Sequence, residues 1–185
     1  MGIDTLGMRA VFLDRDGVIN RAPVKDGRPD SPSRVEEVEI LPGVPEGLLD
    51  LKKEGFLLVV VTNQPDVARG TRSLKSVEEI NRFLRNRLPL DDIRVCYHDD
   101  RDHCLCRKPL PGLLLEAAKE HAIELPRSFM VGDRWRDMEA GERAGCRTIF
   151  MDYGYGEKRP ARYDHRVETF RDAAEWIRMN KDAIP

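Results

Sequence analysis

This 185-residue sequence has few aromatic residues, no marked excess of either charge and no long apolar run. Aromatic residues make up only 6 % of it, and neither charge sign dominates, because 31 lysines and arginines oppose 33 aspartates and glutamates. The longest apolar run, residues 56–61, is six residues long, whereas a membrane-spanning helix needs about 20. We therefore expect no membrane segment and no broad basic surface for nucleic acid.

Cysteine is also scarce, and its placement is informative. Three of the four cysteines lie within eleven residues, which is not the spread of a disulfide framework. The N-terminal sequence MGIDTLGM has neither the basic nor the apolar segment of a secretory signal. We expect a cytoplasmic protein. Since a domain averages about 150 residues and no repeat or linker interrupts the chain, we expect a single domain over residues 1–185.

Apolar strand patterns alternate with helical patterns along the chain. The predicted strands are 9–13, 56–61, 93–96, 128–131 and 148–151. The predicted helices are one from 41–43 to Gly55, then 74–88, 111–122, 137–144 and 170–179. This alternation predicts an α/β fold, a three-layer sandwich with a mostly parallel central sheet. Ligands of such folds bind beyond the carboxyl ends of the strands, so the polar residues there are the candidates for chemistry.

Carboxylates follow two of the predicted strands. Asp14 and Asp16 come directly after the first, and Asp133 and Asp137 follow the fourth. Paired carboxylates at the end of a buried strand can share a hard cation, or divide the roles of nucleophile and acid–base catalyst. Aspartate is also an ordinary turn residue, and Asp137 can equally be an acid at a helix start.

Neutral polar residues lie at the end of the second predicted strand, and basic residues precede the third predicted helix. Thr62 and Asn63 end the second strand and suit a phosphoryl group, although a side-chain-capped loop explains them as well. Arg107 and Lys108 precede the third helix. A lysine beside a carboxylate pair can neutralise a phosphate, whereas an isolated Arg-Lys pair is often only solvated.

Taken in order and spacing, these motifs resemble those of the haloacid dehalogenase superfamily over nearly the whole chain. The matching segments are Asp14-x-Asp16-Gly, Thr62-Asn63, Lys108 and Gly132-Asp133-x3-Asp137. The resemblance implies a phosphomonoesterase in which Asp14 attacks phosphorus to form an aspartyl-phosphate. Asp16 would protonate the leaving group and then activate water. A response-regulator receiver domain is disfavoured, because its phospho-acceptor follows a later strand and lacks the second acid.

The same resemblance implies further roles. Mg²⁺ would be held by the Asp14 carboxylate, the Asp16 main-chain carbonyl and Asp133. Thr62, Asn63 and Lys108 would hold the transferring phosphoryl oxygens, and Asp137 would support the metal waters or Lys108 from behind.

A compact set of metal-binding residue types lies between the third strand and Lys108. Cys96, His98, Cys104 and Cys106 form a Cys₃His set of the kind that holds structural zinc. His103 is a spare imidazole that competes with His98 for this place, and free thiols are the alternative. Cys146, beside Gly145 at a helix end, is expected to be a core thiol.

This set narrows the resemblance to small bacterial phosphatases without a large cap domain. That subfamily includes the D-glycero-D-manno-heptose 1,7-bisphosphate phosphatases and the histidinol-phosphatase domains. The shared segments are LDRDGVIN, VVTNQPDVARG, C-x-H…C-x-CRKP, PGLLLEAA and MVGDRWRDMEAG. The resemblance implies a structural Zn²⁺ in a loop at about 96–106. Arg107 would contact the second phosphate or the sugar, and Arg69 is a further substrate-binding candidate.

Three departures from the subfamily concern substrate choice rather than phosphorus chemistry. They are the acid in Gln64-Pro-Asp66, the short loop between His98 and Cys104, and the long Pro-rich segment 21–39. The leading hypothesis is removal of the 7-phosphate of the heptose bisphosphate by a monomeric enzyme. Histidinol phosphate or another sugar phosphate is the alternative small phosphorylated metabolite. A polynucleotide-end phosphatase and a catalytically silent, zinc-stabilised binding module are distant alternatives.

Overall fold

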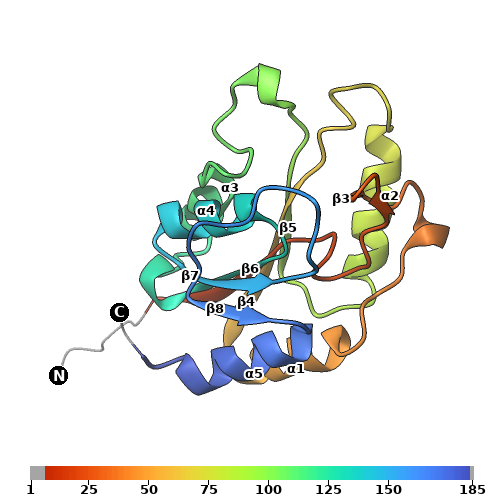
Figure 1. Cartoon of the computed structure of the whole chain (residues 1–185). Coiled ribbons are helices and arrows are strands. Elements are labelled where there is room, and N and C mark those ends of the chain that lie inside the picture. The colour runs from red at the N-terminus through yellow and green to blue at the C-terminus, as the bar shows by residue number, and fades with distance from the viewer. Residues whose placement is uncertain (1–6, 184–185) are drawn as a thin grey trace.

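The computed structural model describes residues 7–183 and contains one six-stranded parallel sheet (Figure 1). Its strand order is β5-β4-β1-β6-β7-β8. The bounds are β1 Arg9–Leu13, β4 Phe56–Asn63, β5 Asp92–Cys96, β6 Phe129–Gly132, β7 Arg147–Met151 and β8 His165–Val167. All five adjacent pairs are parallel, so the carboxyl ends of the strands meet at one edge of the sheet.

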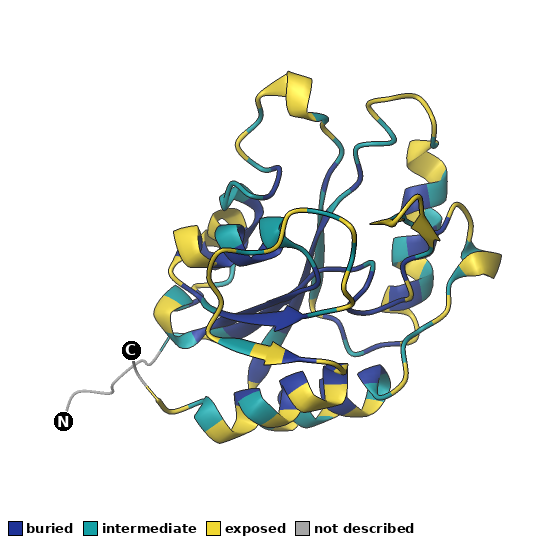
Figure 2. Ribbon diagram, viewed as in Figure 1, coloured by how far each residue is buried: buried dark blue, intermediate teal, exposed yellow. Residues whose placement is uncertain are grey.

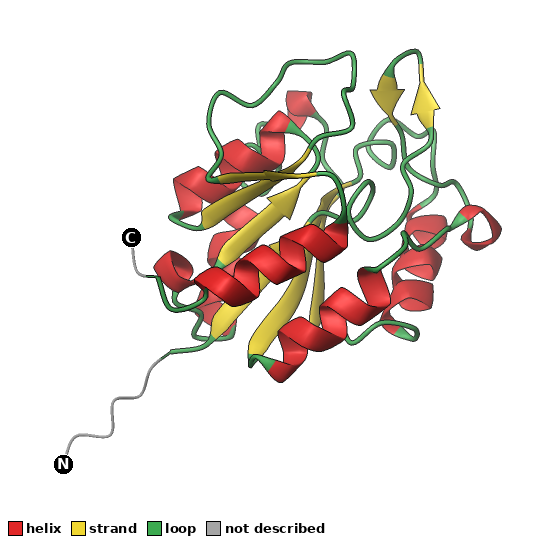
Figure 3. Ribbon diagram, turned by 60° about the horizontal axis from the view of Figure 1, so that its bottom comes forward, coloured by secondary structure: helices red, strands yellow, loops and turns green. Residues whose placement is uncertain are grey.

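Helices cover both faces of this sheet, and the predicted three-layer α/β fold is confirmed. The bounds are α1 Val44–Lys53, α2 Leu74–Arg85, α3 Gly112–Glu120, α4 Trp135–Ala144 and α5 Phe170–Asn180. Short 3₁₀ turns are η1 Val35–Glu37, η2 Asp100–Asp102 and η3 Leu125–Arg127. Helices α1 and α5 lie side by side below the sheet in Figure 1, whereas α3 and α4 lie on the other side. Figure 3 shows the same layers from another angle.

Two apolar cores explain why the strands have few polar residues. Val11 and Leu13 of β1 pack into one core with α1, α2 and α5. Ala10 and Phe12, which point to the opposite face, pack into the other with α3 and α4. A strand buried on both faces is a continuous apolar run instead of an alternating one. The central strands β1, β4, β6 and β7 are accordingly almost wholly buried (Figure 2).

The structure adds elements that the sequence pattern did not predict. Strand β8 lies in a charged segment, and only Val167 of its three residues is buried, so its apolar signal is short. An antiparallel hairpin, β2 Val24–Lys25 and β3 Arg28–Pro29, lies within the Pro-rich segment. Helix α2 ends at Arg85 rather than 88, because Leu88 joins the core from the following turn.

No large cap domain covers the sheet among residues 7–183. Between β1 and α1 the chain forms only the small hairpin and η1. No helix in this described part of the chain combines the length and apolarity needed to cross a membrane. Among residues 7–183, loops and the small hairpin therefore lie over the edge where the strands end.

Candidate active site

The strand register brings the predicted motifs to one place. Leu13, the last residue of β1, pairs with Val60 of β4 on one side and Val131 of β6 on the other. Asp14 directly follows β1, Asp133 directly follows β6, and Thr62 is the penultimate residue of β4, so the three lie at the same edge of adjacent strands. All three are buried, with exposed fractions of 7 %, 1 % and 2 %.

Lys108 occupies the centre of this group. Its Nζ atom donates to Oδ1 of Asp14 at 2.9 Å, to Oδ1 of Asp137 at 2.6 Å and to the Val61 carbonyl at 2.7 Å. Burial alone would lower the pKa of Lys108, but the carboxylates of Asp137 and Asp14 outweigh it and raise the pKa. The lysine is therefore a fixed positive charge inside the site.

A buried carboxylate cluster lies beside the lysine. Carboxylate oxygens of Asp14, Asp133 and Asp137 all lie within 4.8 Å of one another. Neither oxygen of Asp133 has a hydrogen-bond partner within residues 7–183. Burial raises the pKa of Asp133 well above its usual value, and the charges of Asp14 and Asp137 add to it. Unpartnered buried carboxylates are costly unless a cation joins them, so this donor set fits a hard divalent ion such as Mg²⁺.

Gly17 is required by this cluster. Its φ angle is +89°, and a Cβ atom there would lie 1.9 Å from Oδ2 of Asp133. Any side chain at this position would displace the Asp133 carboxylate. The glycine of the first motif thus leaves room for the acid of the last.

Asp16 lies in the same cleft with its carboxylate fully hydrogen-bonded. Its oxygens accept bonds from Arg15, from Asn20 Nδ2 and Gln64 Nε2 at 2.9 Å each, and from Ser31 Oγ at 2.7 Å. Burial would raise the pKa of Asp16, but the Arg15 charge and these donors lower it. The second acid of the first motif is therefore held as an oriented carboxylate.

Asn63 and Thr62 contact their neighbours in different ways. The Asn63 side chain donates to the Lys108 carbonyl at 3.0 Å and accepts from the Lys108 amide at 3.1 Å, which fixes the backbone of the lysine. Thr62 Oγ1 accepts a bond from Gln64 Nε2 at 3.0 Å, so its hydroxyl hydrogen stays available to a ligand.

The cleft in front of these groups contains two arginines that the sequence analysis did not select. Its lining residues are Asp14, Asp16, Pro29, Asp30, Ser31, Thr62, Asn63, Lys108, Arg134, Arg136 and Asp137. Arg134 pairs with Glu157 through Nε at 2.7 Å, and Arg136 lies 3.4 Å from Asp100. Both stand in the segment GDRWRD, and the signal that could have found them was their spacing between the two acids of the fourth motif.

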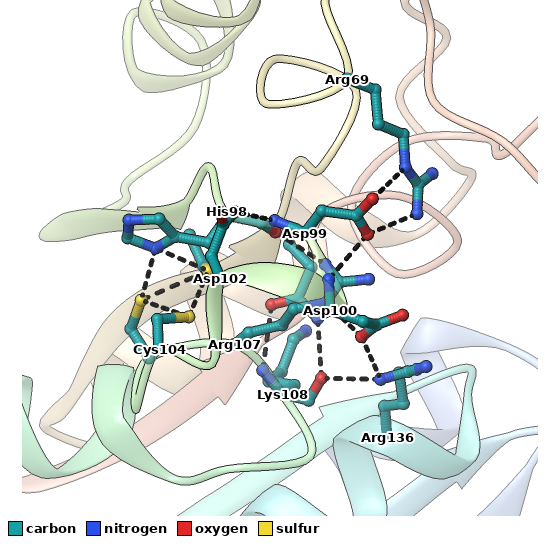
Figure 4. A network of polar contacts seen from close by, with 12 residues as sticks. Arg69, His98, Asp99, Asp100, Asp102, Cys104, Arg107, Lys108 and Arg136 are labelled. Carbon is teal, nitrogen blue, oxygen red and sulfur yellow. Dashed lines mark hydrogen bonds and ion pairs between the residues drawn. The ribbon is translucent and has the colours of Figure 1, made fainter.

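The four Cys₃His residues also meet. The Nδ1 atom of His98 lies 3.6 Å from Cys96 Sγ and 3.3 Å from Cys106 Sγ, and Cys104 Sγ lies 3.4 Å from that of Cys106 (Figure 4). These four donor atoms lie within 4.8 Å of one another. His103 is not a member of this group. Three sulfurs and one imidazole nitrogen at this spacing fit tetrahedral Zn²⁺.

The loop that carries this cluster is tied to the cleft. Arg107 donates from Nε to Asp100 at 2.8 Å and from Nη1 to the His98 carbonyl at 3.2 Å (Figure 4). A second cavity of about 240 Å³, lined by Arg107 among others, shares Lys108 and Arg136 with the cleft. Arg69 does not line the cleft; its guanidinium holds Asp99 through bonds of 3.0 and 2.8 Å.

A parallel sheet whose strand ends gather a buried aspartate, a buried lysine, a threonine and an unpartnered acid is the arrangement expected of a hydrolase of the haloacid dehalogenase type. Comparison with known proteins agrees. Residues 105–173 match the family model described as HAD-hydrolase-like.

Relatives of high similarity extend this match to nearly the whole chain. The D-glycero-β-D-manno-heptose-1,7-bisphosphate 7-phosphatase of Helicobacter pylori strain J99 is 42 % identical over 178 residues, which is 92 % of this chain and 97 % of that protein. The phosphatase of the same name from Photorhabdus laumondii is 40 % identical over 156 residues, 78 % of this chain and 80 % of that one.

A solved structure shares the fold. The D,D-heptose 1,7-bisphosphate phosphatase of B. bronchiseptica, complexed with magnesium and phosphate, aligns with a TM-score of 0.74 at 28 % identity. The alignment covers 94 % of this chain and 99 % of that one. The chain belongs to the family of heptose-1,7-bisphosphate 7-phosphatases within the haloacid dehalogenase-like hydrolases, and it is a phosphatase.

Proposed function

We propose that this enzyme removes the 7-phosphate of D-glycero-β-D-manno-heptose 1,7-bisphosphate. The observation that carries the proposal is the meeting of Asp14, Lys108 and Asp133 in a chain that spans 97 % of a relative with that activity. The substrate class is thus a small sugar bisphosphate.

The first chemical step uses Asp14 as nucleophile. One of its carboxylate oxygens attacks phosphorus in line, and the bond from phosphorus to the C7 oxygen breaks. Asp16 must enter this step protonated; it donates its proton to the departing alkoxide and becomes the carboxylate that Arg15 and the other donors stabilise. In the second step Asp16 takes a proton from water, the water oxygen attacks phosphorus, and the Asp14–phosphorus bond breaks. Phosphate and the unmodified Asp14 carboxylate are the result.

The surrounding groups stabilise the transferring phosphoryl group. Lys108 supplies a positive charge that the contacts to Asp14 and Asp137 hold in place, and the Thr62 hydroxyl supplies a donor. Asn63 contributes by fixing the backbone of Lys108 and through its remaining amide hydrogen. Asp137 acts through Lys108.

We assign the catalytic metal to Asp14, Asp133 and the Asp16 main-chain carbonyl. A Mg²⁺ held there supplies Lewis-acid neutralisation of the phosphoryl oxygens. The pairing of three acids with one lysine supports this assignment, because the buried site has an excess of negative charge.

We assign Zn²⁺ to Cys96, His98, Cys104 and Cys106, with a structural role. The loop at about 96–106 then forms one rim of the cleft, and Arg107 extends from it toward the second phosphate. Arg69 stays a weaker prediction as a substrate contact, since its guanidinium is engaged by Asp99. A single domain over 1–185, a monomer, and the absence of nucleic-acid or membrane partners also stay predictions.

Phosphate release with Mg²⁺ tests the proposal across a panel of both anomers of the heptose bisphosphate, histidinol phosphate and common sugar phosphates. The β-anomer should have the highest kcat/KM, and Asp14→Asn protein should give no release above the blank. If histidinol phosphate or another sugar phosphate has a higher kcat/KM, the proposed substrate is wrong but the proposed mechanism stands. Turnover that survives in Asp14→Asn protein would refute the mechanism itself.

A further inference from the structure

Arg15 stands between the two aspartates of the first motif. Among residues 7–183 it is the bulkiest completely buried side chain, with an exposed fraction of 0 %. None of the proposed chemical steps uses this residue directly. A buried guanidinium must have partners for its charge and its donors. Its partners connect the proposed acid–base residue to a helix outside the site.

The guanidinium makes a two-bond fork to Asp16. Nε donates to Oδ1 at 3.2 Å and Nη2 donates to Oδ2 at 2.9 Å. The other terminal nitrogen, Nη1, donates to Oδ1 of Asn81 at 2.9 Å. Asn81 lies on α2, and its contact fixes the rotation of the guanidinium plane from behind.

Three further donors hold the same carboxylate from other segments. Asn20 Nδ2 donates to Oδ1, while Gln64 Nε2 and Ser31 Oγ donate to Oδ2. Among these partners only Arg15 contacts both oxygens of the carboxylate, and a planar fork of this kind defines the plane of the carboxylate as well as its position. The Asp16 carboxylate lines the cleft together with Asp14.

We propose that Arg15, anchored by Asn81, is the positioning residue that aims the Asp16 carboxyl group at the reacting oxygen. The inference rests on the proposed function, in which Asp16 protonates the leaving alkoxide and later deprotonates water. Arg15 touches neither substrate nor phosphorus in this assignment; it acts through Asp16. Acid–base catalysis by a positioned side chain contributes about 10²- to 10⁴-fold, and a carboxyl group free to rotate loses part of that factor.

Two variants test this role, one by changing Arg15 itself and one by removing only the residue that anchors it. Arg15→Lys keeps the charge but cannot form the fork together with the third bond to Asn81. Asn81→Ala keeps Arg15 and removes only its anchor at the partly buried surface of α2. We expect kcat on the heptose bisphosphate to fall about 100-fold in Arg15→Lys and about 10-fold in Asn81→Ala, within the range of acid–base effects. KM should change by less than about 2-fold. Arg82→Ala, at the exposed neighbouring position of α2, is the matched control and should leave kcat unchanged.

A substrate whose leaving group needs no proton distinguishes a loss of Asp16 positioning from a general loss of structure. With p-nitrophenyl phosphate the departing p-nitrophenolate needs no proton, so Asp14 is phosphorylated at a normal rate. Removal of the phosphoryl group still needs Asp16 to deprotonate water. The variants should therefore release a burst of about one p-nitrophenolate per enzyme before a slow steady rate. A variant that merely unfolds in part would lose burst and steady rate in the same proportion.

Two results would overturn the inference. One is an unchanged kcat in Asn81→Ala and Arg15→Lys; the other is a burst that shrinks in step with the steady rate. If Arg15→Lys fails to fold, Asn81→Ala alone decides. Failure of the proposed function is distinct from both, because it appears as absent turnover in the wild type or as turnover in Asp14→Asn protein.

Discussion

Nζ of Lys108 lies 2.9 Å from Oδ1 of Asp14, although 94 residues separate the two in the chain. Both side chains are buried. The ammonium also contacts Asp137, so one positive charge serves two carboxylates that would otherwise repel each other. We therefore predict that the stability and the activity of the enzyme depend on the same lysine.

Lys108→Met removes that charge while keeping most of the side-chain volume. We expect kcat to fall by at least about 10²-fold, the usual effect of losing one group that stabilises the transition state. The free energy of unfolding should fall by about 3–5 kcal/mol, because buried carboxylates lose their partner. Phosphate release and urea unfolding measure the two effects. Lys119→Met, on the exposed side of α3, is the control. Activity in Lys108→Met within about 2-fold of wild type would contradict the assigned role.

Asp14→Asn should stabilise the Mg²⁺-free protein in a pH-dependent way. Burial raises the pKa of Asp14 from 3.8 to about 6, although Lys108 opposes the shift. The contribution of this carboxyl group to stability is therefore complete below pH 3.8 and is lost as the pH rises through about 6. Asparagine carries no charge and can still accept the Lys108 bond. The free energy of unfolding of the variant should therefore rise relative to that of wild type by about 3 kcal/mol as the pH rises from about 4 to about 7. This figure follows from about 1.4 kcal/mol per pKa unit.

Urea unfolding of both proteins in Mg²⁺-free buffer measures this difference. Saturating Mg²⁺ should reverse the order at neutral pH, because the ion stabilises only the protein that binds it. A difference that stays constant with pH, or that Mg²⁺ does not change, would contradict the assignment of Asp14 to the metal site.

Cys106→Ser should release zinc. A thiolate that contributes to a structural zinc site also contributes to folding, so the variant should contain little zinc and have a Tm lower by more than about 5 °C. Cys146→Ser is the matched control, since Cys146 lies in the apolar core away from the cluster. Metal analysis by mass spectrometry decides. Equal zinc content in the two variants would mean that the ligand set is wrong.

Arg72→Ala should loosen the hairpin at the cleft. The buried Arg72 side chain lies 3.7 Å from Asp30 and 3.6 Å from Asp66, and it donates to the Ser31 carbonyl at 3.0 Å. It thus links the segment after β3 to the loop after β4. We expect faster amide hydrogen exchange over residues 24–31 and a loss of about 1–3 kcal/mol. Arg28→Ala, an exposed hairpin position, is the control. Unchanged exchange in Arg72→Ala would show that other contacts hold the hairpin.

The same contacts account for one departure from the subfamily pattern. Asp66 is the acid in one of the segments that depart from the subfamily pattern. Its oxygens lie 3.6 Å from Arg72 and 3.5 Å from Arg69. Its partners are arginines that neutralise it, and nothing in the chain order indicated which basic residues would approach.

The fold class was predictable from local patterns, and the phosphatase class from the order of the motifs that carry the family resemblance. The apolar runs that became β1, β4, β6 and β7 are buried on both faces, and such runs carry a strong signal that needs no knowledge of their neighbours. The acids, Thr62 and Lys108 followed in a fixed order along the chain. The short β8 and the hairpin escaped prediction, because two or three half-exposed residues form strands only when a neighbour offers its hydrogen bonds.

The sequence by itself determined which side chains are available and the order in which strands deliver them to one edge. Only the tertiary structure decided their partners. It made Arg15 the support of Asp16, placed Asn63 on the backbone of Lys108, and grouped His98 rather than His103 with the cysteines. The physical reason is that strand and helix periods are local properties of the chain. The pairing of buried charges depends instead on distances between segments far apart in sequence, and those distances exist only once the sheet and its loops are packed.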